Sequence, residues 1–70
     1  MNHEMINLIL TKALVDKEFC QLLLKETEEA IKEFDLTPEE ITVLTRIKAS
    51  TLEEFSEKIY RWMLEREKRL

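Results

Sequence analysis

Hydrophobic side chains recur every three or four positions along this chain, which is the spacing that gathers them on one face of an α-helix. Polar and charged residues fill the positions between them. The pattern predicts four helices, over residues 3–15, 17–34, 38–48 and 52–67. We therefore expect an all-α fold, a compact orthogonal bundle of four helices.

The first predicted helix has one broad apolar face and two further apolar residues outside it. Asn2 is its expected N-cap. Leu8 and Val15 lie one heptad apart on the far side, so they are either exposed to solvent or the seam for a second chain. The residues expected in the core are Met5, Ile6, Ile9, Leu10, Ala13 and Leu14.

The second predicted helix keeps one apolar stripe in phase, with Asp16 as its N-cap and Asp35 at its end. Because neither Gly nor Pro interrupts residues 17–34, we predict a continuous helix there; a kink near Glu26 and Thr27 is the alternative. The stripe consists of Phe19, Cys20, Leu23, Leu24, Ala30, Ile31 and Phe34.

The third predicted helix has the clearest start in the chain. Thr37 precedes Pro38, and Glu40 follows three residues after Thr37, which is the spacing of a capping box. Leu36 and Ile41 can close a hydrophobic staple around it. The residues that we expect this helix to bury are Ile41, Leu44 and Ile47.

The fourth predicted helix begins with the same capping-box pattern, in which Ser50 or Thr51 is paired with Glu53 or Glu54. Tyr60 and Leu64 lie outside its main stripe, four residues apart. They are either simply exposed or a contact surface. The stripe expected in the core is Leu52, Phe55, Ile59, Trp62 and Met63.

Composition limits the chain to one domain over residues 1–70 and limits its partners. The formal net charge of −4 opposes general nucleic-acid binding. A helix-turn-helix over residues 37–66 is an alternative, but Glu53 and Glu54 would then face the major groove. Basic residues collect in 58–70, Arg61 among them, and either complement a helix dipole or form a docking patch for an acidic partner.

The sequence also favours a cytoplasmic protein without a membrane partner. No apolar run approaches the roughly 18 residues that a membrane span needs, and the N-terminus lacks the features of a signal peptide. The single Cys cannot form an internal disulfide, which agrees with a reducing compartment.

Residues with catalytic chemistry are few. The only His is His3, at a terminus where we expect mobility. Cys20 lies on an apolar stripe, where we expect it to pack in the core. The pattern lacks Glu-x-x-His pairs for a di-metal site, Cys and His for structural zinc, and Gly for a phosphate loop. We therefore expect no enzyme activity, no metal and no cofactor.

Three segments follow one another along the chain: Leu22-Leu23-Leu24, residues 30–40 ending in Leu36-Thr37-Pro38-Glu39-Glu40, and Ser50-Thr51-Leu52-Glu53-Glu54. In this order they resemble the small helical fold of the alpha subunit of protocatechuate 4,5-dioxygenase. Similar folds occur in the leader regions of ribosomally made, modified peptides, including nitrogen-fixation-type leaders and borosin precursors. The resemblance implies a non-catalytic module recognised by an enzyme, either a subunit covering a catalytic partner or a handle delivering a peptide substrate.

These observations favour partner recognition as the function. We expect a protein partner, an enzyme, with a homodimer as the alternative. The residues predicted to bind the partner are Leu8, Val15, Tyr60, Arg61 and Leu64.

Overall fold

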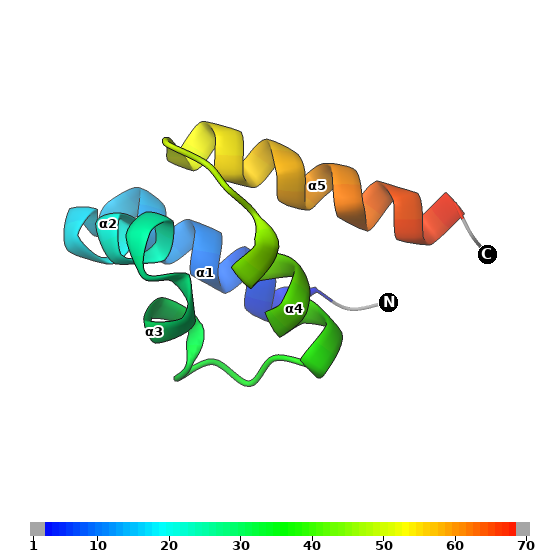
Figure 1. The fold of residues 1–70 in the computed structure, drawn as a ribbon, viewed down its shortest axis with the longest axis horizontal. Coiled ribbons are helices and arrows are strands. Elements are labelled where there is room, and N and C mark those ends of the chain that lie inside the picture. The colour runs from blue at the N-terminus through cyan, green and yellow to red at the C-terminus, as the bar shows by residue number, and fades with distance from the viewer. Residues whose placement is uncertain (1–2, 69–70) are drawn as a thin grey trace.

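Residues 3–68 are described by the computed structural model, and every element in them is a helix. Figure 1 shows this part of the chain with its five helices labelled. They are α1 (Glu4–Val15), α2 (Lys17–Lys25), α3 (Thr27–Ile31), α4 (Pro38–Arg46) and α5 (Leu52–Lys68). The predicted all-α class is confirmed, and the orthogonal arrangement of the bundle stays a prediction.

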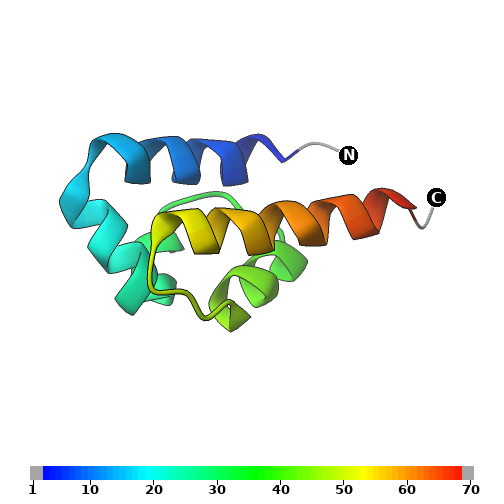
Figure 2. The same ribbon diagram turned by 90° about the horizontal axis from the view of Figure 1, so that it is seen from above.

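The two longest helices, α1 and α5, lie side by side and run in opposite directions (Figures 1 and 2). All five helices contribute to a single core, in which burial of apolar surface supplies the main stabilisation. The buried side chains are Ile6, Ile9, Leu10, Ala13, Phe19, Leu23, Ala30, Ile31, Leu44, Phe55 and Ile59.

Helix α1 buries a narrower face than its sequence predicts. Leu14 was expected in the core but is 75% exposed, whereas its neighbour Ala13 is buried. Consecutive residues of a helix are rotated by about 100°, so Leu14 lies on a flank that the other helices leave uncovered. Asn2, the predicted N-cap, lies outside the described residues. His3 precedes the helix and makes no side-chain cap.

The predicted continuous helix over residues 17–34 is wrong, because the chain leaves helical geometry at Glu26 (φ −130°, ψ 65°). The alternative, a kink near Glu26 and Thr27, is correct. The Thr27 hydroxyl donates to the Leu23 carbonyl at 2.8 Å, the acceptor that the Thr27 N–H would use in a continuous helix. Side-chain bonds of this kind compete with the helical ladder and bend it.

The start of α4 confirms the predicted capping box. The Thr37 hydroxyl accepts from the Glu40 N–H at 3.1 Å, and the Glu40 carboxylate accepts from the Thr37 N–H at 2.9 Å. Glu40 thereby takes the inward position of the first turn, with 7% of its surface exposed. Ile41, predicted to be buried, is displaced to a flank and is 42% exposed.

The start of α5 also follows the prediction, with one shift. The Thr51 hydroxyl accepts from the Glu54 N–H at 3.1 Å. The returning bond goes from the Ser50 N–H to Glu54 at 2.9 Å, one residue earlier than in a standard capping box. The helix then runs through the predicted stripe, in which Phe55 and Ile59 are fully buried.

Candidate functional site

The five residues predicted to bind a partner all lie on the surface, on two different helices. Leu8 and Val15 project from α1 with 55% and 81% of their surface exposed. Tyr60 and Leu64 project from α5 with 49% and 59% exposed. Arg61 is exposed beside them. We describe the two surfaces separately, as the α1 face and the α5 face.

The α5 face consists of Tyr60, Arg61 and Leu64. Tyr60 and Leu64 are one helical turn apart and therefore point to the same side. Arg61 donates a hydrogen bond to Glu57 at 3.1 Å, in an ion pair with both side chains exposed. Such a pair contributes little to stability, so Arg61 can exchange this partner for another carboxylate.

The α1 face consists of the exposed residues Asn7, Leu8, Thr11, Leu14 and Val15. Helical geometry places these five on one side of α1. Glu4 is exposed on the same side of the helix, one turn before Leu8, so this face also carries a charge. Sequence reasoning found Leu8 and Val15 but assigned Leu14 to the core.

Lys12 lies beside this face on α1, one turn after Leu8. Its Nζ atom is 4.7 Å from the centre of the Phe19 ring and 5.9 Å from that of Phe34. A cation at this distance is attracted to the face of an aromatic ring. The lysine is therefore engaged with α2 and the turn after α3.

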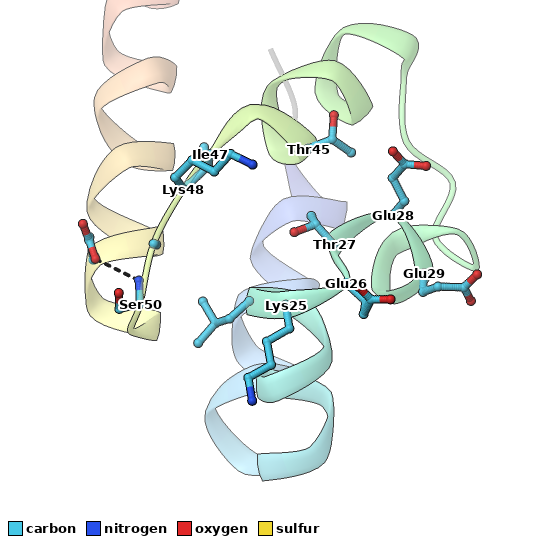
Figure 3. A pocket seen from close by; sticks show the side chains of 12 residues that line it. Lys25, Glu26, Thr27, Glu28, Glu29, Thr45, Ile47, Lys48 and Ser50 are labelled. Atoms are coloured by element: carbon cyan, nitrogen blue, oxygen red, sulfur yellow. Dashed lines mark hydrogen bonds between the residues drawn. The ribbon is translucent and has the colours of Figure 1, made fainter.

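A cleft of about 640 Å³ lies between the α2–α3 junction and the connection from α4 to α5. Figure 3 shows its polar side chains, and those of Lys25, Glu28 and Glu29 point in different directions instead of converging. A small-molecule site normally needs a few polar groups aimed at one point. This cleft lacks that arrangement in the side chains drawn.

Two carboxylates of the cleft already have partners within the chain. Glu29 pairs with Lys32 at 2.8 Å, and this hydrogen bond raises the pKa of the Lys32 ammonium. The Ser50 N–H bonds to Glu54 and lowers the pKa of that carboxyl, with Lys58 adding a smaller effect of the same sign. Both pairs stabilise local helix structure, and neither presents a free acid to a substrate.

A contact that sequence reasoning missed joins His3 to α4 and α5. Nδ1 of His3 lies 3.4 Å from Oε2 of Glu40, and both side chains are about nine-tenths buried. The His3 ring also meets the Trp62 ring edge-on, with centroids 5.7 Å apart. The Arg66 guanidinium lies over the Trp62 ring, 5.4 Å from its centre. Arg66 also forms an ion pair with Glu39. His3 is therefore largely buried against α4 and α5, a placement that the sequence did not indicate.

Glu40 uses its second oxygen to cap α4, so both carboxylate oxygens have partners. Cys20, the one thiol of the sequence, packs against the core. Between residues 3 and 68, no three His, Cys, Asp or Glu side chains lie close enough to hold a metal ion. No helix in that part of the chain has the length and hydrophobicity of a membrane span.

No protein family, curated protein or solved structure compared with this chain matches it.

Proposed function

We propose that this chain is a non-catalytic helical binding module, recognised by a partner enzyme through the α5 face. The observation that carries the proposal is the exposure of Tyr60 and Leu64, one turn apart on the longest helix. A soluble domain leaves large apolar side chains in one patch mainly where another molecule covers them.

The position of α5 suits recognition by a groove. Figures 1 and 2 show its last turns extending beyond the ends of α1 and α4, so a partner can approach the helix from several sides. A helix laid in an apolar groove is bound through anchors spaced three or four residues apart. Tyr60 and Leu64 have this spacing, and Tyr is among the residues that most often dominate binding energy.

Site-specific photocrosslinking in the native host tests the proposal. A photoreactive amino acid at Leu64 is expected to form an adduct with one enzyme, identified by mass spectrometry. The same amino acid at Thr42, exposed on α4, is the matched control. Identical adducts from both positions, or none at Leu64, contradict recognition by the α5 face.

Calorimetry with the purified enzyme then measures how much Tyr60 and Leu64 contribute to the binding affinity. We expect Tyr60→Ala and Leu64→Ala each to weaken binding by about tenfold or more, because each loses at least 1.4 kcal/mol of apolar contact. Gln21→Ala, exposed on α2 and away from the α5 face, should change the affinity by less than about twofold. Turnover of a substrate by the isolated chain would contradict a non-catalytic role.

An enzyme assay distinguishes the two forms of this proposal, in which the chain is either a leader-like segment attached to a substrate or an accessory subunit of the enzyme. If the chain is a handle, a peptide substrate fused after Leu70 is modified faster than the free peptide. If the chain is an accessory subunit, the enzyme gains activity on adding the chain in equal amount, with no fusion needed.

A further inference from the structure

We draw no further inference here: the strongest candidate, the exposed α1 face with Leu8 and Val15, carries the charge of Glu4 and has Lys12 beside it, and nothing in the structure shows what covers it.

Discussion

Oε2 of Glu40 lies 3.4 Å from Nδ1 of His3, although the two residues are 37 positions apart in the sequence. The contact fastens the start of α1 to the first turn of α4. The other oxygen of the same carboxylate caps α4 through the Thr37 N–H. One buried side chain therefore holds a local structure and a long-range contact together.

We expect Glu40→Ala to lower the free energy of unfolding by about 2 kcal/mol, since it removes a cap and leaves its partners without an acceptor. Glu40→Gln should cost less, because the amide oxygen can still accept from Thr37. Urea denaturation followed by circular dichroism measures both. Glu57→Ala is the control, as it removes only an exposed ion pair worth about 0.5 kcal/mol or less. Equal losses for Glu40→Ala and Glu57→Ala would contradict a special role for Glu40.

Leu22 and Leu23 are adjacent on α2 but differ in burial, which gives a matched pair for the core. Leu23 is fully buried, whereas Leu22 is 39% exposed. We expect Leu23→Ala to cost about 2–5 kcal/mol and Leu22→Ala less than about 1 kcal/mol. Thermal unfolding measures the difference. Similar losses at both positions would show that the helix is rotated from the orientation described.

The break between α2 and α3 depends on the hydroxyl of Thr27. Thr27→Val keeps the shape of the side chain but removes the donor to the Leu23 carbonyl, and we expect a loss of about 1 kcal/mol. Thr42→Val is the control, because the Thr42 hydroxyl makes the same kind of bond, to Pro38, on an exposed helix surface. Its effect should stay within about 0.5 kcal/mol. Chemical denaturation distinguishes the two outcomes.

Glu54 should make stability depend on pH in the acid range. The Ser50 N–H, with a smaller contribution from Lys58, lowers the pKa of the Glu54 carboxyl from its ordinary value of 4.5. A lowered pKa in the folded state stabilises the protein above pH 4.5, and this contribution is lost as the pH falls through the folded-state pKa. The difference in urea midpoint between the natural chain and Glu54→Gln is therefore expected to be constant near neutrality and to shrink below pH 4.5.

Lys58→Met separates the two causes of this shift. It removes the ammonium but keeps the hydrogen bond from Ser50, so most of the pH dependence should remain. A midpoint difference that grows on acidification would mean that the carboxyl is destabilising when ionised, contrary to the hydrogen bond observed.

Interactions within three or four residues were predictable from the sequence. The caps at Asp16, Thr37 and Thr51 all form, because each links a side chain to a backbone group in the next turn. The stripe through Phe19 and Leu23 is buried as its spacing indicates. The exposure of the predicted binding residues followed for the same reason, since each lies off the apolar stripe of its own helix.

The tertiary structure decided which of several locally allowed arrangements occurs. Sequence spacing permits Leu14 and Ile41 to be buried, but neighbouring helices cover only part of each apolar face, and Glu40 takes the inward position beside Ile41. A continuous helix through Glu26 and a break there are both locally allowed, and the break occurs, with the Thr27 hydroxyl bonded to the Leu23 carbonyl. The pairing of His3 with Glu40 has no local signal at all. The sequence by itself determined where helices start and which stripe each can bury; only packing between helices decided how much of each stripe is covered, because that depends on residues far apart in the chain.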